Sequence, residues 1–371
     1  MKTIGHKIKL PPLDSERAKE AKVLAFMNNK GGCGKTSTSI AEGVYLARSG
    51  KNVLFIDCDS QCNLSQRMGI SDDLFQDRRL TECFNLMENE DFLEQQMHLP
   101  ISIHFKYLYK LQGFDGKHGT IALLPGSQFA EDVAALTIKK LSGSLTLAYE
   151  QRQIGKRFKA AIRKFLEYFD YVILDTAPAL EGSLLCQLAL QASDEIICPV
   201  DGLEAALGLQ HVIDWLNMQS SPSYGILEKP NLTLALTKYH EDDIEELISM
   251  TEGHPIKNAV FSALKDVLGQ YVCDNGIRED KSKKNKVYQV YGRINDYEDL
   301  CGEIARKISQ PRPNFFENWN INSANRLRAK LRIIEAVTLK KKTPVFKDIM
   351  YQGKKGKKIL ELDNVDVGTR H

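Results

Sequence analysis

The most informative segment of this sequence is Lys30-Gly31-Gly32-Cys33-Gly34-Lys35-Thr36. It follows a short apolar segment, residues 22–27, and precedes a helical pattern over residues 36–48. A glycine-rich loop between a strand and a helix turns several backbone N–H groups toward one point, where the helix dipole also attracts an anion. The stretch therefore predicts a P-loop that binds the phosphates of a nucleotide.

The residue types in this loop suit that task. Gly31, Gly32 and Gly34 let the backbone approach phosphate without side-chain obstruction. We expect Lys35 to reach the β- and γ-phosphates and the Thr36 hydroxyl to bind Mg²⁺. The predicted nucleotide-binding residues of the loop are Asn29, Lys30, Gly31, Gly32, Cys33, Gly34, Lys35, Thr36 and Ser37.

The loop differs from the usual G-x-x-x-x-G-K-[ST] pattern in one respect. Position 29 is asparagine, and Lys30 adds a second lysine at the loop entrance. A plain glycine-rich turn before a helix is the alternative, but the flanking strand and helix argue against it.

Three carboxylates follow strands in the order that a nucleotide site requires. Asp57 ends the apolar segment 52–57, and Asp59 follows it two positions later. Side chains at positions i and i+2 of an extended chain point to the same side. One can serve Mg²⁺ and the other can hold a water molecule. Asp175 closes the apolar segment 171–175 and has the form of an acid that binds Mg²⁺ through water. The predicted metal ligands are Thr36, Asp57 and Asp175.

The alternation of strands and helices predicts the fold class. Further short strands are expected at 121–124, 195–200 and 232–237, with a long helix over about 145–168. Residues 72–98 have a helical pattern and residues 99–120 an irregular one. This order predicts an α/β fold with a mostly parallel twisted sheet and helices on both faces. Ligands in such folds bind at the carboxyl ends of the strands.

Composition limits the cellular setting. The eight cysteines are scattered without a CxxC pair, which suits a reduced compartment better than disulfides or a zinc site. The N-terminus is polar, and no stretch is apolar enough for a transmembrane segment. We expect a cytoplasmic protein, associated with the nucleoid if it binds DNA.

Charge divides the chain unevenly. Residues 311–371 hold 14 Lys and Arg against 6 Asp and Glu, whereas residues 1–310 hold 36 against 42. Pro311-Arg312-Pro313 marks a boundary between the two parts. We therefore expect a nucleotide-binding domain over 22–310 and a basic, helical or disordered extension over 311–371. Residues 1–21, which precede the first strand, are expected to form an N-terminal extension. A basic amphipathic helix is expected over 325–339, with Leu327, Leu331 and Ile334 inward. An anionic partner or a solvated appendage would each explain the charge.

With these elements the sequence resembles the deviant Walker A ATPases of the ParA/MinD family, and within it the ParA-type partition ATPases, over residues 22–308. The resemblance is carried by the segments 29–36, 53–64, 123–127, 169–178 and 198–200 followed by 206–209. Ser60, Cys62 and Ala177 depart from the residues usual at those positions.

The resemblance implies cofactors, partners and residue roles. Lys30 matches the signature lysine that crosses an ATP-sandwiched homodimer to the partner's phosphates, and Lys35 with Thr36 matches the ordinary P-loop pair. Asp59 matches the residue that orients the attacking water, so the implied catalytic residues are Lys30, Lys35 and Asp59. Ile277 and Arg278 match, loosely, a stretch that packs on adenine. The implied cofactors are ATP and Mg²⁺; the implied partners are non-specific DNA and a ParB-like or other adaptor protein.

Three alternatives remain at this stage. A MinD-like membrane-positioning ATPase would use a basic amphipathic helix to bind acidic lipid. An iron–sulfur protein of the same superfamily would need cysteines at cluster spacing, which Cys83, Cys186 and Cys198 do not reproduce. An ATP-dependent ligase or kinase acting on a small metabolite could use the same fold.

Overall fold

The structure, a computed structural model, describes most of the chain. The described residues are 6–7, 20–71, 73–103, 118–142, 147–178, 182–219, 229–239, 256–278, 284–285, 290–291 and 293–342. The strands are β1 (His6–Lys7), β2 (Lys22–Phe26), β3 (Val53–Cys58), β4 (Ile101–Ser102), β5 (Ile121–Leu124), β6 (Tyr171–Thr176), β7 (Glu195–Val200), β8 (Asn231–Tyr239), β9 (Val272–Arg278), β10 (Lys284–Asn285) and β11 (Val290–Tyr291).

Helices alternate with these strands along the chain. They are α2 (Lys35–Arg48), α3 (Asn63–Arg67), α4 (Leu80–Leu86), α5 (Phe92–Gln95), α6 (Ala130–Ser142), α7 (Leu147–Phe165), α8 (Leu184–Ala192), α9 (Leu203–Gln219), α11 (Ile256–Leu268), α12 (Ile294–Ser309), α13 (Phe315–Asn318) and α14 (Ile321–Lys342). Short 3₁₀ turns occupy Gln76–Arg78, Gln96–His98 and Gly269–Tyr271.

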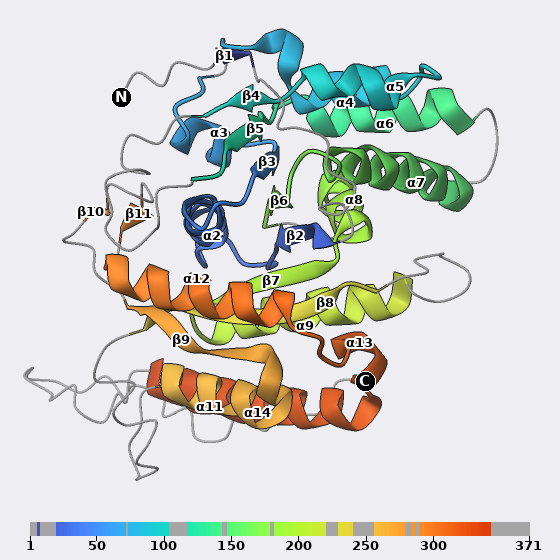
Figure 1. The fold of residues 1–371 in the computed structure, drawn as a ribbon. Coiled ribbons are helices and arrows are strands. Elements are labelled where there is room, and N and C mark those ends of the chain that lie inside the picture. Colours follow the sequence, from blue (N-terminus) through green and yellow to red (C-terminus); the bar gives the residue numbers. More distant parts are fainter. Residues whose placement is uncertain are drawn as a thin grey trace, which may run out of the picture.

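Most strands of the described residues form one sheet, which runs through the middle of the molecule (Figure 1). It has nine strands in the order β1-β4-β5-β3-β6-β2-β7-β8-β9. Neighbours from β5 to β9 are parallel. Near one edge, β4 runs antiparallel to both of its neighbours, β5 and β1. The carboxyl ends of the parallel strands therefore meet at one edge, as expected for an α/β nucleotide-binding fold.

Helices cover both faces of the sheet because successive strand residues point to opposite sides. On β2, Leu24 and Phe26 pack with α2 and α12, whereas Val23 and Ala25 pack with the helices opposite. That second face is covered by α4, α6, α7 and α8 at one end of the sheet, and by α9 and α11 at the other (Figure 1). The predicted fold class is confirmed.

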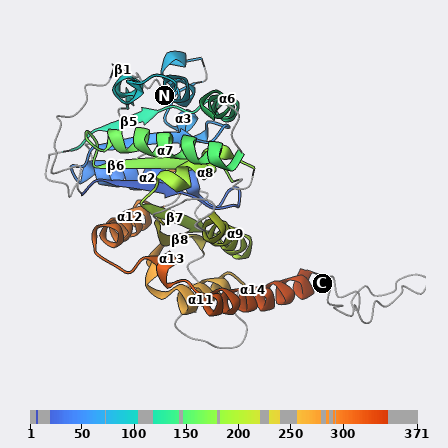
Figure 2. The ribbon, with the colours of Figure 1, turned by 90° about the vertical axis from the view of Figure 1, so that its right-hand side faces the viewer.

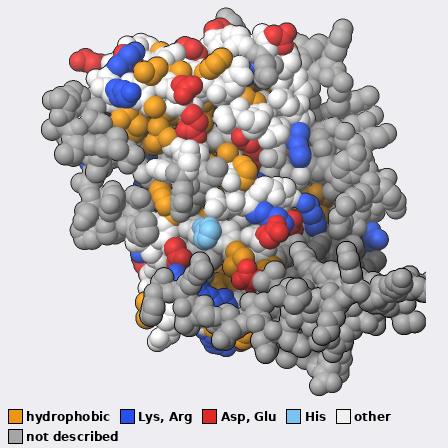
Figure 3. Space-filling model, turned by 180° about the vertical axis from the view of Figure 1, so that it is seen from behind, with side chains coloured by type: hydrophobic (Ala, Val, Ile, Leu, Met, Phe, Trp, Pro, Cys, Tyr) orange, Lys and Arg blue, Asp and Glu red, His pale blue; other side chains and the backbone are white. Residues whose placement is uncertain are grey.

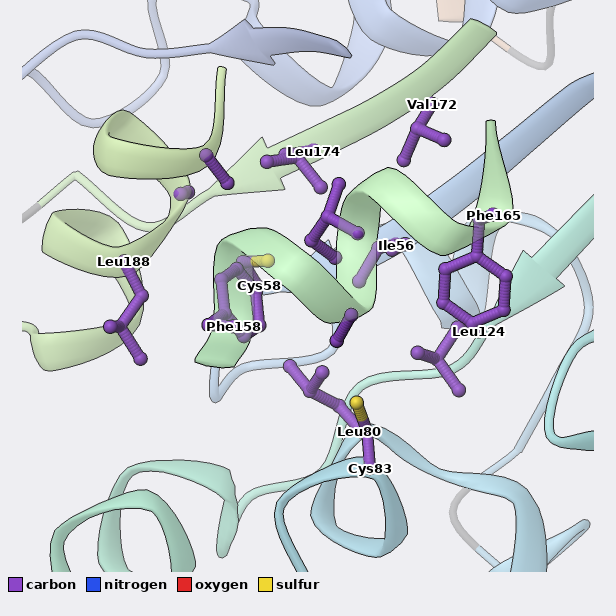
Figure 4. Close-up of a cluster of buried hydrophobic side chains, with 14 of the residues drawn as sticks. Ile56, Cys58, Leu80, Cys83, Leu124, Phe158, Phe165, Val172, Leu174 and Leu188 are labelled. Atoms are coloured by element: carbon purple, nitrogen blue, oxygen red, sulfur yellow. The ribbon is translucent and has the colours of Figure 1, made fainter. Parts of the chain in front are cut away.

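The close-up in Figure 4 shows how the second face is filled. Phe158 and Phe165 of α7 lie over strand side chains that include Cys58, Leu124 and Leu174, all without exposed surface. Burying a side chain of this size contributes about 1.5–3 kcal/mol. The apolar runs that predicted strands are thus the residues enclosed between helix layers.

The C-terminal helices pack against the end of the sheet that carries β8 and β9. Phe315 and Phe316 of α13 and Leu327 and Leu331 of α14 are buried with α9 and α11. Figures 1 and 2 show α14 alongside α11 and extending beyond it. The predicted inward face of the basic helix is the buried face, and the helix is longer than expected; residues 343–371 lie outside the described residues.

Ion pairs tie this segment to the rest of the protein. Arg312 pairs with the buried Glu195 at the start of β7. On α14, Arg326 and Lys330 both contact Asp266 of α11, at 2.7 and 3.0 Å. Arg328 of α14 contacts Asp214 of α9 at 2.8 Å. Three of the helix's cations are therefore matched by acidic residues of the domain.

Two regions differ from the sequence expectations. Residues 72–98, which were expected to be helical, contain α4, α5 and two 3₁₀ turns. Strand β4 lies within the stretch expected to be irregular, of which 104–117 are outside the described residues. Strand β9 was not predicted, because polar residues interrupt its apolar pattern. The Glu303 carboxylate accepts hydrogen bonds from the backbone N–H groups of Asp274 and Asn275, at 2.8 Å each, which compensates for a bulged strand pairing.

In the described part of the chain, no helix combines the length and apolar character needed to cross a membrane.

Gly43 lies where helix α2 packs directly on strand β3. A Cβ at this position of α2 would lie 2.0 Å from the ring of Phe55 on β3, a buried side chain without room to move. The helix can therefore lie on the sheet only if residue 43 has no side chain.

We expect Gly43→Ala to lower the free energy of unfolding by about 1–3 kcal/mol because of overpacking. This loss should appear although alanine favours a helix over glycine by about 1 kcal/mol. Gly302→Ala on α12 is the matched control, since its added carbon would meet the movable Tyr45 hydroxyl at 3.0 Å. Urea unfolding monitored by circular dichroism measures both, and equal stabilities of the two variants would contradict the prediction.

Glu42 is an uncompensated carboxyl group on α2, where this helix faces α12. It is fully buried, and neither carboxylate oxygen has a hydrogen-bond partner within the described residues. Burial raises the pKa of Glu42 to about 8, slightly opposed by the neighbouring Cys301 thiol. The folded protein therefore holds a proton that an unfolded chain releases near its ordinary pKa of 4.5.

Because the pKa of Glu42 is higher in the folded state, stability should fall as pH rises from about 4.5 to about 8. We expect Glu42→Gln, which cannot ionise, to be more stable than the wild type by about 1–3 kcal/mol at pH 8 and nearly equal to it at pH 5. Glu90→Gln, at an exposed position, is the control. Unfolding midpoints at several pH values test this; a Glu42→Gln curve parallel to the wild type would refute it.

Candidate functional site

The phosphate loop leaves β2 after Phe26 and enters α2 at Lys35. Gly32 and Gly34 have φ angles of +76° and +102°, in the left-handed region that favours glycine. Gly34 stands at the N-cap, and no side chain caps this described helix end. The N–H groups of the first turn are therefore directed into the loop without a side-chain acceptor. This geometry suits an anion.

Lys35 and Thr36, at the start of α2, contact different parts of the site. Lys35 is buried, and its Nζ donates a hydrogen bond to the Lys30 carbonyl oxygen at 2.9 Å, which holds the ammonium over the loop. The Thr36 hydroxyl donates to Asp175 at 2.7 Å. Thr36 of the predicted loop and the predicted metal ligand Asp175 are thus in direct contact.

Asp57 and Asp175 lie side by side at the carboxyl ends of β3 and β6, where they are register partners. Both are completely buried. Burial raises the pKa of Asp57 to about 6, opposed by its hydrogen bonds from Ser65. Burial, and next the negative charge of Asp57, raise the pKa of Asp175 to about 7. Two carboxylates in this arrangement are short of positive charge, which a divalent cation would supply.

Two serines that the sequence motifs did not indicate hold these acids. Ser39 donates to Asp175 at 3.3 Å, and Ser65 donates to Asp57 through its hydroxyl at 2.6 Å and its backbone N–H at 2.8 Å. Ser39 follows Thr36 by three residues and so lies on the same helix face, which is a signal that sequence could have provided. Ser65 is brought to Asp57 by the fold of α3, and no sequence spacing marks it.

Asp59 is held by the turn that follows β3. Its carboxylate accepts hydrogen bonds from the Gln61 backbone N–H and the Asn63 side-chain amide, both at 2.9 Å. Asp59 is 5% exposed. These two donors fix the direction of the carboxylate, as a residue that positions a water molecule requires.

The donors present fit Mg²⁺. Thr36 and Asp175 offer oxygen atoms, the ligands that this ion prefers, next to the phosphate loop. Among the residues described, no three His, Cys, Asp or Glu side chains form a metal-binding group. The roles of Thr36, Asp57 and Asp175 as ligands stay predictions.

Asn28 fixes the loop to a neighbouring element. Its side-chain amide is buried and donates to the carbonyl oxygens of Pro199 and Ala205, both at 2.9 Å, while its oxygen accepts from the Lys30 N–H at 3.0 Å. A Cβ at Gly208 of α9 would lie 2.3 Å from the Asn28 oxygen. The sequence analysis did not identify Asn28, although the sequence does show an asparagine between the strand and the glycine-rich loop.

Lys30 points toward the same region. Its Nζ contacts Asp201 at 2.9 Å and Glu204 at 3.5 Å. Partial burial lowers the pKa of Lys30, but the hydrogen bond and charge of Asp201 outweigh this effect and raise it above its usual range. Lys238 of β8 also contacts Asp201, at 3.5 Å, and donates to the Gly32 carbonyl oxygen. The sequence analysis did not predict the contacts of Lys30 with Asp201 and Glu204, nor the contact of Lys238 with Asp201.

Three other predicted loop residues make ordinary local contacts. Asn29 lies 3.3 Å from the His211 ring on α9, and Cys33 is buried beneath the loop. Ser37 accepts a hydrogen bond from Arg67 at 2.8 Å. Their positions in or beside the loop are as expected, and their contact with nucleotide stays a prediction.

Ile277 and Arg278 lie on β9, away from the loop in sequence but next to β8 in the sheet. Ile277 is buried opposite Thr237. The Arg278 guanidinium and backbone N–H both bind Asp296 of α12, the latter at 2.9 Å. These contacts give both residues structural roles, and their predicted contact with adenine stays a prediction.

Comparisons with known proteins identify the family of the chain. The AAA domain family matches residues 21–107 and 127–225. The chromosome-partitioning ATPase Soj of Thermus thermophilus is 31% identical over 215 residues, which cover 57% of this chain and 68% of that protein. The chain spans 62% of the length of the first curated relatives that it matches.

Solved structures show the same fold. The ATP complex of McdA from Cyanothece is 19% identical with a TM-score of 0.56, covering 79% of this chain and 98% of that one. Cobyrinic acid a,c-diamide synthase from Mycobacterium smegmatis, with bound ADP and magnesium, is 22% identical with a TM-score of 0.52, covering 80% and 99%. These likenesses concern the fold alone.

Three observations lead to one assignment. They are the two lysines of the phosphate loop, the paired acids at the strand ends and the extent of the family match. The chain belongs to the ParA-type P-loop ATPases.

Proposed function

We propose that this protein is a Mg²⁺-dependent ATPase that dimerises when it binds ATP, binds DNA non-specifically and uses hydrolysis to position DNA or another cargo in the cytoplasm. The observation that supports this best is the pair of lysines at the two ends of one phosphate loop. The Lys35 ammonium is held over the loop by its hydrogen bond to the Lys30 carbonyl oxygen, whereas the Lys30 side chain reaches outward to acidic side chains. Lys35 is sufficient to bind the phosphates of the nucleotide in its own protomer. Lys30 would therefore be available to contact the nucleotide of a second protomer.

The arrangement of side chains suits hydrolysis of a terminal phosphate. Asp59 would orient a water molecule in line with the γ-phosphorus, because Gln61 and Asn63 fix its carboxylate. Lys35 and the loop N–H groups would hold the negative charge that develops on the phosphate oxygens. Bound Mg²⁺ would neutralise further charge there, with Thr36 and Asp175 as the residues that hold it.

DNA as a partner is supported by the names of partition relatives such as Soj and by the basic C-terminal segment. On the face shown in Figure 3, the described Lys and Arg side chains lie among Asp and Glu, without one large basic area. On α14 three cations are matched by Asp214 and Asp266. Non-specific binding would then depend on basic groups gathered by dimerisation or carried by the rest of the tail. A ParB-like or other adaptor that stimulates hydrolysis belongs to the same proposal.

The contacts of α14 weigh against a membrane-binding role. An interfacial helix must place its apolar face in lipid. In α14 that face is occupied, since Leu327 and Leu331 are buried against the domain. Ile321 and Ile333 are the large apolar side chains of its described part that are exposed, and they lie twelve positions apart.

The cysteines weigh against an iron–sulfur cluster. All eight are free and buried, and none of the described ones joins a metal-binding group. The likeness to cobyrinic acid a,c-diamide synthase shows that metabolic enzymes share the fold, but it does not identify a metabolite pocket here.

Three substitutions separate the steps of the proposed cycle. We expect Lys35→Ala to lose ATP binding, because the phosphate charge loses its main counter-ion. Lys30→Ala should bind ATP but neither dimerise nor hydrolyse it, and Asp59→Ala should bind ATP and dimerise while turnover falls about 100-fold or more. Fluorescent-nucleotide binding, light scattering after gel filtration and phosphate release measure the three steps.

Lys51→Ala, an exposed change just beyond α2, is the matched control for the lysine variants and should behave as the wild type. A Lys30→Ala protein with full activity would exclude the sandwich dimer while leaving the P-loop assignment intact. Turnover that required a small metabolite, and was indifferent to DNA and protein partners, would favour the metabolic alternative.

Binding to the two surfaces can be compared directly. We expect ATP to promote binding to non-specific duplex DNA and salt to weaken it, because contacts to phosphate release counter-ions. Vesicles of anionic phospholipid should not retain the protein under the same conditions. Co-sedimentation with each partner, with and without ATP, measures this; retention by vesicles alone would favour the membrane alternative.

A further inference from the structure

Asp201 lies between two lysines at the edge of the phosphate loop. It follows β7 directly, and its carboxylate is 8% exposed. Lys30 contacts one of its oxygens at 2.9 Å and Lys238 contacts the other at 3.5 Å. Glu204, in contrast, is 75% exposed and lies 3.5 Å from Lys30. Water can stabilise the negative charge of Glu204, because this side chain is exposed. The charge of the nearly buried Asp201 carboxylate depends instead on protein cations.

The backbone at Lys238 is bent toward the loop. Lys238 has a φ of +56°, which costs a non-glycine residue roughly 1 kcal/mol, and the pairing of β8 with β9 shifts register at this point. The bend lets the Lys238 ammonium donate to the Gly32 carbonyl oxygen. The adjacent Thr237 hydroxyl donates to the Cys33 carbonyl oxygen at 2.8 Å. The end of β8 thus presents a lysine to the phosphate loop and to Asp201 together.

The pair between Lys30 and Asp201 competes with any contact between protomers. A lysine whose Nζ lies 2.9 Å from an acid of its own chain cannot reach a phosphate in another protomer without leaving that acid. If Lys30 left without a replacement, the nearly buried Asp201 carboxylate would lose its closest counter-ion, which is a costly change. Lys238, already within 3.5 Å, is the replacement that the structure provides.

We propose that Asp201 holds Lys30 within its own protomer and so opposes ATP-dependent dimerisation, and that Lys238 takes over the Asp201 carboxylate when Lys30 crosses to the partner. This inference rests on the proposed sandwich dimer. Asp201 and Lys238 are positioning residues: neither needs to touch the reacting atoms, and both act through Lys30. The device sets the protein concentration at which ATP joins two protomers.

The test is the dimer dissociation constant in a saturating, non-hydrolysable ATP analogue with Mg²⁺, measured by analytical ultracentrifugation. Asp201→Asn should tighten the dimer about three- to tenfold, since Lys30 no longer leaves an ion pair. Lys238→Met should weaken it by a similar factor, because Lys30 then becomes the sole cation among the described residues that pairs with Asp201. Glu204→Gln, at the exposed acid, is the control and should change it less than about twofold.

A double variant distinguishes this exchange from a general structural effect. In Asp201→Asn protein the Lys238→Met change should have little effect on dimerisation, because no carboxylate is left to neutralise. Nucleotide affinity of the dilute monomer reports on an intact loop and should stay within about twofold of the wild type in each variant.

The outcomes separate the two proposals. A wild-type protein that stays monomeric with the ATP analogue would overturn the sandwich dimer itself. A wild type that dimerises, with Asp201→Asn dimerising at the same or a higher protein concentration, would overturn the role of Asp201 alone. Additive effects of Asp201→Asn and Lys238→Met would overturn the exchange of counter-ions.

Discussion

The buried side-chain amide of Asn28 is the contact on which the site depends. With two donated hydrogen bonds to the β7–α9 junction and one accepted from the Lys30 N–H, it determines how the chain leaves β2. A buried amide of this kind must be satisfied fully, so only one path of the loop is compatible with it. Gly208 on α9 provides the space for that path, since any side chain there would collide with the amide. The phosphate loop and the helix that carries Glu204 are thereby held in one arrangement.

A second constraint is the concentration of negative charge at the carboxyl ends of the central strands. Asp57 and Asp175 are buried as register partners, and the protein meets their hydrogen-bonding needs with hydroxyl and backbone donors instead of cations. Such donors stabilise the carboxylates without neutralising them, which leaves the site able to bind a divalent cation. The raised pKa values of both acids express this shortage of positive charge. On the other side of the loop the balance is reversed, where Lys30 and Lys238 share Asp201.

The C-terminal segment illustrates how charge and packing act together. By composition it is a basic tail, yet α13 and α14 bury aromatic and aliphatic side chains against α9 and α11. Arg312 compensates the buried Glu195, and Asp214 and Asp266 receive cations from α14. Four of the fourteen Lys and Arg residues of this segment, Arg312, Arg326, Arg328 and Lys330, are therefore paired with acidic residues of the protein. Net charge alone overstates the positive charge that the segment offers to an anionic partner.

The phosphate loop, the order of the strand-end acids and the α/β class could be predicted from residue patterns, because each depends on local spacing. Glycines before a helix and apolar runs ending in aspartate indicate the same structures in many folds. The residues that support these groups could not be predicted in this way, because packing brings them together from distant segments. Asn28, Ser65, Asp201 and Lys238 come from separate segments, and their roles arise from hydrogen bonds and ion pairs between elements distant in sequence. Strand β9 could not be predicted for a similar reason. Its sequence is partly polar and has no apolar pattern, and the Glu303 carboxylate of α12 stabilises it by accepting hydrogen bonds from its backbone.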